Sequence, residues 1–583
     1  MSEKSKITLL YVIVFLISFT LISRIFYLQI IKGKYYKNVY ENKSIRILEI
    51  PTVRGKILDR NGVVLAEDVP SYYLVITKSY LKDPDKELSY VSKIIGMSVK
   101  DIKSKLDNPG IPSFDPVIIK RELTLKQVIA IKEHSFELPG VDISLRAKRI
   151  YPYKEIGENF LGFVGLVTKE DLEHDKFYSY NDYIGKQGIE KEYEQFLRGK
   201  KGKEEVQIDA SGRIIKVISS IPPVPGDNIY LTIDIRLQKE LEKIVGNRPG
   251  VSIAIDPDNG EILAMVSHPS FDPNKIINGI SDKEYAKLSK QSAFFNRAVQ
   301  GEYPSGSTFK PITLIAALMT HTITKDTIIY CRNSIRIGNV TFRDWIYPNA
   351  FGYQNPEEAL ANSSDVFFYT IGTKTGIDAI DKYAKAFGLG EKTGIDLPSE
   401  STGLLPSPEW KKKTMGTEWY IGDTANLSIG QGFLLVTPIQ MATLYEGLAE
   451  NGLEYVPHFL LKITDSSGNI IKSYGKKIRL KANIPDNVMN VVKKGMEMLA
   501  NRPEMRIMKI GGRTVYAKTG TAEVGKNAVD HWLIAFSGKN KPDIVGLFFF
   551  DHSNFDSSHS LAPLMAKLFD TYYKTIKTGG NNG

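Results

Sequence analysis

The chain has 583 residues, of which 42% are hydrophobic and 24% are charged. This composition is typical of globular proteins and excludes collagen-like, low-complexity and disordered classes. At roughly 100–200 residues per domain, the length predicts two or three domains. The net charge of +10 is mild and no long basic run accompanies it, so we expect no nucleic-acid partner. A single cysteine, Cys331, excludes a disulfide framework, an iron–sulfur cluster and a CxxC zinc site.

The N-terminal segment is the longest apolar stretch. Residues 7–23 carry no charge, and beyond Arg24 the apolar run resumes to Ile31. A helix of about 17–25 residues would reach roughly 26–37 Å, enough for a hydrocarbon core of about 30 Å. Because no A-x-A cleavage site follows, the sequence favours an uncleaved anchor over a signal peptide. Basic residues flank both ends, and the short N-terminus favours an orientation with that end inside.

Residues 40–220 are expected to form a domain of strands, turns and charged helices. The pair Asn61-Gly62 between apolar runs predicts a tight hairpin turn. Apolar residues that recur from Ile189 to Leu197 predict one amphipathic helix that ends at Gly199. The region shows no catalytic cluster, so we expect a scaffold or partner-binding role.

A second domain is predicted after the segment 219–228, which holds three prolines and a glycine. Residues 250–266 form two apolar runs around Pro-Asp-Asn-Gly, which predicts an antiparallel hairpin. Helices, three more strands and a last helix follow, and the order predicts one antiparallel sheet with helices on its faces. The late elements are expected at residues 513–517, 532–536, 544–550 and 561–576.

Ser307 and Lys310 form the first pattern that carries chemistry. A breaker-rich loop from Tyr303 precedes them, and Pro311, which has no N–H to donate, favours a helix start close to Ser307. Three residues apart, the two side chains would share one face of the first turn. The positive helix end and burial would favour a neutral Lys310 that accepts the hydroxyl proton, which makes Ser307 a candidate nucleophile. The same spacing opens no apolar helix at Ser79/Lys82 or Ser473/Lys476.

Lys-Thr-Gly occurs four times, and only the copy at Lys518 lies at the end of a predicted sheet strand, residues 513–517. There an ammonium, the hydroxyls of Thr519 and Thr521 and an unpaired edge N–H can face one substrate. Gly520 would let a substrate backbone approach closely. Such an array favours a carboxylate ligand.

The third pattern, Ser363-Ser-Asp365, lies directly before a strongly apolar stretch. By itself it is typical of a helix N-cap. In the order Ser-x-x-Lys, Ser-x-Asp, Lys-Thr-Gly, however, the three patterns form the constellation of active-site serine acyltransferases. His531, at the start of a predicted strand, is more simply a structural histidine.

At these motifs the sequence resembles the penicillin-binding protein/serine β-lactamase superfamily, and specifically the class B penicillin-binding proteins. The third place of the middle motif is more usually Asn, and Asp365 there is similar to the elongation-type penicillin-binding protein 2 group. The resemblance implies an α/β multi-domain fold: a transpeptidase domain with an antiparallel five-stranded sheet flanked by helices, an α+β pedestal and one transmembrane helix. It covers nearly the whole chain, and its markers are the anchor and residues 54–62, 185–190, 303–311, 428–432 with Thr437-Pro438, and 518–523.

The resemblance implies peptidoglycan D,D-transpeptidation without a cofactor or a metal. Ser307 would attack the penultimate D-Ala carbonyl of a stem pentapeptide while Lys310 takes its proton. The oxyanion would lie between the backbone N–H groups of Ser307 and Thr521. An amine of a neighbouring stem peptide would then resolve the acyl-enzyme, and β-lactams would trap Ser307.

The remaining site residues act, in this family mechanism, on the leaving group and the substrate carboxylate. Ser363 with Asp365 would relay a proton to the leaving amine. Lys518 would supply positive field, and the hydroxyls of Thr519 and Thr521 would hold the terminal carboxylate. Asp365 could also keep Lys310 protonated through a charge pair, which leaves open which group is the base.

The resemblance further implies a single-pass protein of the bacterial inner membrane with a cytoplasmic N-terminus and an extracytoplasmic catalytic domain. The implied partners are stem pentapeptides, β-lactams as inhibitors, a SEDS-family glycosyltransferase and other membrane proteins of the elongation complex. The expected domains are residues 1–6, the anchor at 7–31, the pedestal at 40–220, the transpeptidase domain at 221–576 and a flexible tail at 577–583.

Two alternatives share parts of this pattern. A D,D-carboxypeptidase or a β-lactamase would share the catalytic set, but a β-lactamase needs no pedestal, and no Glu-x-x-Leu-Asn follows Asp365. A catalytically idle scaffold of a wall-synthesis complex is the second, and the intact residues Ser307, Lys310 and Lys518 argue against it.

Overall fold

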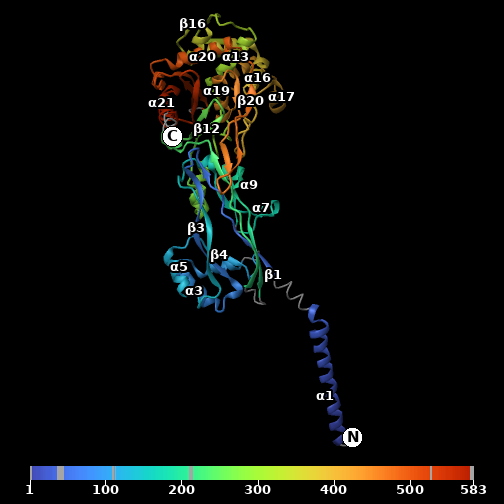
Figure 1. Ribbon diagram of the computed structural model, residues 1–583. Coiled ribbons are helices and arrows are strands. Elements are labelled where there is room, and N and C mark those ends of the chain that lie inside the picture. Colours follow the sequence, from blue (N-terminus) through green and yellow to red (C-terminus); the bar gives the residue numbers. More distant parts are fainter. Residues whose placement is uncertain are drawn as a thin grey trace. The chain divides into compact units, whose positions relative to one another are not determined.

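A computed structural model describes residues 3–35, 45–107, 111, 113–180, 182–208, 214–525, 528–553 and 555–577 (Figure 1). The chain forms two compact units, each assembled from segments that are separate in the sequence. Residues 578–583 of the expected tail lie outside the described residues. The domain limits expected from the sequence stay predictions. Unit 1 comprises Met1–Arg54, Asp68–Lys148 and Gly199–Gly226, and unit 2 comprises Gly55–Glu67, Arg149–Arg198 and Asp227–Gly583.

The N-terminal apolar segment is one long helix. Helix α1 spans Glu3–Phe26 and continues as a π-helical turn over Tyr27–Ile31. Its apolar side chains are exposed along its length, with Tyr11 at 71% and Phe15 at 68%. At 29 residues the continuous helix is long and apolar enough to cross a membrane.

Unit 1 contains two small antiparallel sheets. One pairs strands β1, β8 and β9, and the other pairs the later part of β3 with β4 and β5. Helices α3, α4 and α5 cover the second sheet through a core that includes Leu74, Leu88 and Ile102. The bounds are β1 Ile45–Ile50, β3 Val64–Thr77, α3 Pro84–Ile95, α4 Val99–Leu106, β4 Pro116–Lys120, α5 Leu125–Glu133, β5 Val141–Ile150, β8 Gly202–Ile208 and β9 Ile214–Ile221.

A tight turn links β2 (Ile57–Leu58) to the start of β3, as the pair Asn61-Gly62 predicts. The buried Asp59 carboxylate accepts hydrogen bonds from the backbone N–H groups of Asn61 and Val63, each at 2.8 Å. Strand β10 (Asn228–Leu231) runs parallel to β2 and antiparallel to β18 (Leu460–Thr464), which pairs with β19 (Ile470–Ser473).

The single helix expected from Ile189 to Leu197 is wrong. Two short helices, α8 (Gly188–Glu192) and α9 (Glu194–Leu197), take its place and are separated at Tyr193. The Tyr193 hydroxyl donates to Asp396 Oδ2 at 2.7 Å, so a contact 203 residues away fixes this side chain and overrides the local helical pattern. Shorter elements nearby are α6 Glu158–Leu161, β6 Val164–Leu166, α7 Lys169–His174 and β7 Tyr183–Gly185.

Five antiparallel strands form the central sheet of unit 2, in the order β12-β11-β23-β22-β21. This sheet confirms the predicted fold class, and the expected hairpin at 250–266 is its β11–β12 pair. The strands are longer than the apolar runs that predicted them. Their bounds are β11 Gly250–Asp256, β12 Glu261–His268, β21 Thr514–Glu523, β22 Val529–Gly538 and β23 Pro542–Phe550.

Both faces of the sheet are buried, because alternate residues enter different cores. Leu533 and Phe548 pack in one core with helices α10 and α21, whereas Trp532 and Phe549 pack in the other with helices α13 and α19. Burial on both faces explains the nearly continuous apolar runs of β22 and β23. The helix bounds are α10 Ile235–Val245, α13 Lys310–Met319, α19 Pro438–Ala449 and α21 Ala562–Tyr572, which continues as a π-helical turn to Lys577.

The remaining helices and strands belong to unit 2, and some of them carry residues of the site. The helices are α11 Pro273–Asn278, α12 Asp282–Lys290, α14 Pro356–Asn362, α15 Asp365–Thr375, α16 Ile377–Ala386, α17 Pro408–Met415, α18 Ile421–Ser428 and α20 Asp486–Ala500. The strands are β13 Ile329–Cys331, β14 Ser334–Ile337, β15 Val340–Arg343, β16 Gly352–Gln354, β17 Leu453–Tyr455 and β20 Ile478–Lys481.

Candidate active site

The predicted nucleophile lies on a short 3-10 turn, Gly306–Phe309, that leads directly into α13. In this turn residues three apart eclipse one another, so Ser307 and Lys310 lie on one face, as expected. Ser307 is partly exposed and lines a cleft of about 920 Å³, whereas Lys310 is fully buried. Within the described part of the chain, the Ser307 hydroxyl has no hydrogen-bond partner, so its proton and lone pairs are available to a ligand.

Lys310 is held by three oxygens of the Ser363-Ser-Asp365 motif. Its Nζ donates to the Asp365 Oδ1 at 2.6 Å, to the Ser363 carbonyl at 2.7 Å and to the Ser363 Oγ at 3.1 Å. The ring of Phe368 lies 5.3 Å away. The amine of Lys310 and the carboxylate of Asp365 form an ion pair at this distance. The structure therefore supports the charge pair that the sequence left open.

Lys518 reaches the same hydroxyl from the sheet. Its Nζ donates to Ser363 Oγ at 3.0 Å and to the carbonyl of Thr519 at 2.9 Å. Complete burial, followed by the charge of Lys310, holds the pKa of Lys518 well below its usual range. Ser363 Oγ thus bridges a lysine paired with a carboxylate and a lysine whose surroundings favour the neutral amine. Hydrogen bonds thus join the three groups in one series.

The Lys-Thr-Gly motif lies inside β21 and not after it, so the strand end expected at residue 517 is wrong. The pairing of β21 with β22 continues from Thr514 to Glu523 and carries the motif along the edge of the sheet. The sequence pattern ended early because Lys518 and Thr519, although polar, are buried. Thr521 is exposed on this edge, and its Oγ1 lies 2.8 Å from Ser558 Oγ.

Gly520 allows the edge strand to pack against the nucleophile turn. A Cβ at this position would lie 2.8 Å from Thr308 Cγ2 and 2.9 Å from the Ser305 carbonyl oxygen. Either contact is closer than side chains tolerate. The expected contact of Gly520 with a substrate backbone stays a prediction.

Two protein-family models match the sequence of the chain. The penicillin-binding protein transpeptidase domain matches residues 250–570, and the penicillin-binding protein dimerisation domain matches residues 49–231. The chain belongs to the penicillin-binding proteins. The resemblance inferred from the motifs is therefore confirmed, and this penicillin-binding protein is a D-Ala-D-Ala transpeptidase by class.

Individual relatives of this penicillin-binding protein agree over nearly its full length. The peptidoglycan D,D-transpeptidase MrdA of Salmonella typhimurium is 34% identical, and the match covers 94% of this chain and 93% of that one. Penicillin-binding protein 2 of Helicobacter pylori, solved in complex with MreC, is 27% identical with a TM-score of 0.82, covering 91% and 100%. A chain from a peptidoglycan synthase complex of polymerization and crosslinking is 27% identical with a TM-score of 0.71, covering 98% of each chain. The elongation-type likeness is thereby confirmed.

The cleft of this penicillin-binding protein contains residues that the motifs did not single out. Asp344, from the loop after β15, accepts hydrogen bonds from Ser364 Oγ and the Val366 N–H, each at 3.0 Å. It therefore fixes the turn that presents Ser363. No local signal marks Asp344, because its partners lie 20 and 22 residues further along the chain. The cleft is also lined by Arg343, Trp345, Tyr347, Asn426, Gln431, Arg502, Glu523, Phe555 and His559.

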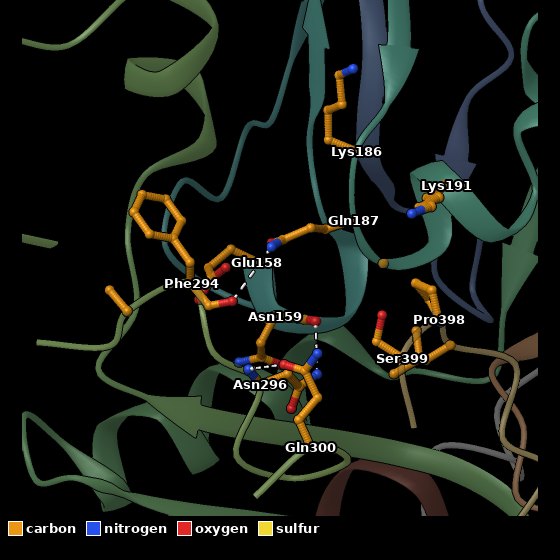
Figure 2. A pocket seen from close by; sticks show the side chains of 13 residues that line it. Glu158, Asn159, Lys186, Gln187, Lys191, Phe294, Asn296, Gln300, Pro398 and Ser399 are labelled. Atoms are coloured by element: carbon orange, nitrogen blue, oxygen red, sulfur yellow. Dashed lines mark hydrogen bonds between the residues drawn. The ribbon is translucent and has the colours of Figure 1, made fainter. Parts of the chain in front are cut away.

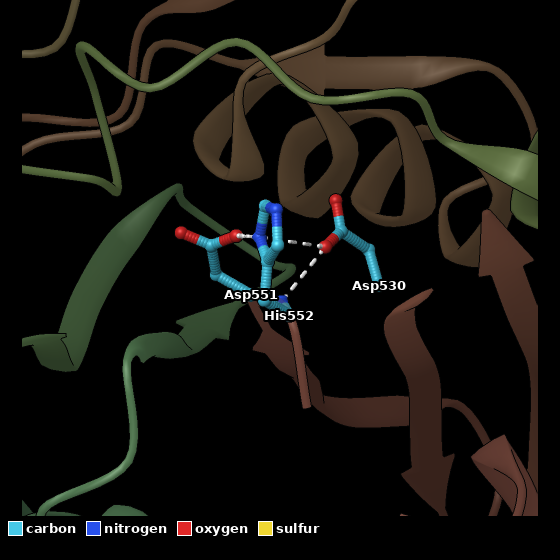
Figure 3. A group of neighbouring side chains, drawn as sticks. All are labelled: Asp530, Asp551 and His552. Atoms are coloured by element: carbon cyan, nitrogen blue, oxygen red, sulfur yellow. Dashed lines mark hydrogen bonds and ion pairs between the residues drawn. The ribbon is translucent and has the colours of Figure 1, made fainter. Parts of the chain in front are cut away.

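His531 lies in the wall of the cleft, where its Nδ1 is 2.7 Å from Ser553 Oγ. Burial lowers the pKa of His531 below its ordinary value, which favours a neutral ring. Asp530, which precedes His531 in the sequence, forms a hydrogen-bonded group with Asp551 and His552 (Figure 3). Asp530 accepts the backbone N–H of His552 at 3.0 Å, and burial raises its pKa to about 6. This group fixes the loop after β23 and with it Ser553.

Proposed function

We propose that Ser307 is the nucleophile of a peptidoglycan D,D-transpeptidase and that Ser363 conducts protons between Lys310 and Lys518 during acylation. The observation that carries the proposal is the position of Ser363 Oγ, which lies within hydrogen-bond distance of both amines. The free hydroxyl of Ser307 faces the same cleft as Ser363. A serine nucleophile needs such a proton acceptor, since it is weak at its ordinary pKa.

In the proposed acylation, every proton moves from a named donor to a named acceptor. Lys310 passes one proton through Ser363 to the neutral Lys518 and accepts the proton of Ser307 as Ser307 Oγ attacks the penultimate D-Ala carbonyl. The negative charge that develops on the carbonyl oxygen is stabilised by the backbone N–H groups of Ser307 and Thr521. When the C–N bond breaks, Ser363 gives its proton to the leaving D-Ala amine and regains one from Lys518.

The second half-reaction reverses these steps. The amine of a neighbouring stem peptide attacks the acyl-enzyme, its proton returns through Ser363, and Ser307 leaves with a proton from Lys310. Thr519, Gly520 and Thr521 form the edge on which the substrate's terminal carboxylate would bind. The exposed Thr521 hydroxyl can donate a hydrogen bond to an anion there. In a β-lactam, the carboxylate is placed relative to the reactive carbonyl as the terminal carboxylate of D-Ala-D-Ala is placed relative to the penultimate carbonyl. A β-lactam would therefore acylate Ser307.

The cellular setting is part of the proposal. Helix α1 would anchor the protein in the bacterial inner membrane with the N-terminus in the cytoplasm and the transpeptidase domain outside. We expect a SEDS-family glycosyltransferase and other elongation-complex membrane proteins as partners. This expectation is supported by the relatives, among which one was solved with MreC and another in a peptidoglycan synthase complex.

Labelling with fluorescent penicillin tests the nucleophile. The wild-type protein should bind the label covalently, and Ser307→Ala should lose it. Ser79→Ala is the matched control, because Ser79 opens another Ser-x-x-Lys pattern and is exposed in unit 1. An unlabelled wild-type protein, or equal labelling of wild type and Ser307→Ala, would overturn the proposal.

A further inference from the structure

The hydroxyls of Thr521 and Ser558 form a hydrogen-bonded pair in the cleft, which both residues line. Thr521 is exposed on β21, whereas Ser558 is only 3% exposed and opens the 3-10 turn Ser558–Leu561, which leads into α21. Leu561 of this turn is buried in the core that contains α21, and this burial fixes the turn. Ser558 is therefore a fixed neighbour of Thr521, and the proposed reaction steps do not use it.

The direction of the hydrogen bonds at this pair follows from the number of protons. Ser558 Oγ lies 2.5 Å from the carbonyl oxygen of Gly520 and 2.8 Å from Thr521 Oγ1. A carbonyl oxygen only accepts, and two oxygens this close need a proton between them, so the single hydroxyl proton of Ser558 points to Gly520. The bond between the two hydroxyls then takes its proton from Thr521. Thr521 therefore presents oxygen lone pairs, and no proton, to the cleft.

This orientation of the Thr521 hydroxyl opposes the ligand that the edge of β21 is proposed to hold. A carboxylate only accepts hydrogen bonds, so its oxygens would face the lone pairs of Thr521. A hydroxyl proton rotates to suit its partner, and Thr521 can donate to the carboxylate once its proton turns away from Ser558. The cost of this rotation is the hydrogen bond at 2.8 Å that the buried Ser558 accepts.

We propose that Ser558 is a positioning residue that holds the proton of Thr521 and thereby weakens the binding of the substrate's terminal carboxylate. The inference rests on the proposed function, which places that carboxylate on this edge. Ser558 acts through Thr521, because it is buried and gives its own proton to Gly520. The carboxylate is bound both before and during acylation, so Ser558 lowers the affinity for the ligand and leaves the chemical step unchanged.

Stopped-flow acylation of the full-length protein in detergent by a fluorescent penicillin tests this role. Ser558→Ala frees the proton of Thr521 for the carboxylate of the penicillin. The acylation rate at low penicillin concentration should therefore rise by about fivefold, the equivalent of one hydrogen bond, while the limiting rate at saturation stays unchanged. A serine that only supported β21 would weaken binding when removed. An unchanged or lower rate at low concentration, or a gain confined to the limiting rate, would overturn the proposal.

Two further comparisons assign the gain to the carboxylate and to Thr521. The methyl ester of the same penicillin has a neutral acceptor in place of the carboxylate, so the charge-assisted bond is lost and Ser558→Ala should change its acylation much less. Thr521→Val removes the proton itself, and in that background Ser558→Ala should give no gain. An equal gain with the ester, or in the Thr521→Val background, would contradict the assignment.

Ser558→Cys provides a second route if Ser558→Ala does not fold, because a thiol occupies a similar space but accepts a hydrogen bond only weakly. It should raise the rate at low penicillin concentration by a smaller factor, and an unchanged or lower rate would argue against the role of Ser558. Ser560→Ala is the matched control, since Ser560 is an exposed serine two residues further along the same turn, and it should behave as the wild type. A wild-type protein that penicillin does not label would contradict the proposed function. A labelled protein without the gain would contradict only the role of Ser558.

Discussion

The cleft around Ser307 and the cavity around Glu158 both contain buried ionisable groups, but they satisfy them differently. In the cleft, each of the two buried amines donates to oxygens of the protein itself. The cavity has a volume of about 150 Å³ and lies in unit 2, outside the cleft (Figure 2). At its wall, the buried carboxyl of Glu158 and the amide of Asn159 each leave an oxygen without a partner among the described residues. Groups that must act on a substrate are thus fixed in advance, which is how preorganised sites stabilise developing charge.

Removal of the Ser363 hydroxyl, which bridges the two buried amines of the cleft, should have the largest effect on the rate of acylation. Ser363→Ala breaks the route between Lys310 and Lys518 and leaves both amines without their common acceptor. We expect the rate of acylation by a fluorescent penicillin to fall by about 10²–10⁴, the usual contribution of a positioned proton-transfer group. Stopped-flow fluorescence measures this rate. A variant that acylates at the wild-type rate would exclude Ser363 from the proton route.

Lys518→Arg removes the proton acceptor at this position. Arginine stays protonated and cannot accept a proton from Ser363, so acylation should slow by about 10². The lowered pKa of Lys518 means that the neutral amine is present at pH values where a free lysine is charged. The wild-type rate should therefore fall as the pH decreases through that lowered pKa, and the variant should lack this limb. A pH profile with the same limb in both proteins would assign it to another group.

Gly520→Ala tests the packing that holds the edge strand against the nucleophile turn. The added methyl group would overlap Thr308 and the Ser305 carbonyl, and overpacking of this kind costs about 1–3 kcal/mol. We expect a lower midpoint of thermal unfolding together with slower acylation. If both quantities match the wild type, the close approach of β21 to Ser305 is not required.

Glu454 offers a third arrangement, a buried carboxyl with one partnered and one unpartnered oxygen. Its Oε2 accepts from Arg479 Nη1 at 2.8 Å, whereas Oε1 has no partner among the described residues. Burial raises its pKa to about 7, so the folded protein keeps a proton that the unfolded chain has lost above about pH 4.5. Stability should therefore fall as the pH rises from about 5 to 7, by about 1 kcal/mol for each pH unit.

Glu454→Gln removes this titration and should flatten the decline of the free energy of unfolding between pH 5 and 7. Urea unfolding at several pH values measures the difference between variant and wild type. Parallel curves for the two proteins would mean that Glu454 ionises with its ordinary pKa.

The sequence predicted the residues that meet at the candidate site, and it predicted the five-stranded sheet, because both depend on local patterns. The hairpin at 250–266 and the helix that follows Ser307 each have signals within a few residues. The features it missed depend on distant partners. Tyr193 interrupts a helix because Asp396 binds its hydroxyl, β21 continues through Lys518 because the cleft buries that amine, and Asp344 holds Ser363 in place across 20 residues. The unpartnered oxygen of Glu158 has no signature in sequence, since it follows from how separate segments enclose a cavity.

The position of the acyl group after reaction with penicillin tests the central claim most directly. Mass spectrometry of the digested, acylated protein should place one penicilloyl adduct on the peptide that contains Ser307, and fragmentation should place it on that side chain. An adduct on Ser363, or on any serine other than Ser307, would contradict the account.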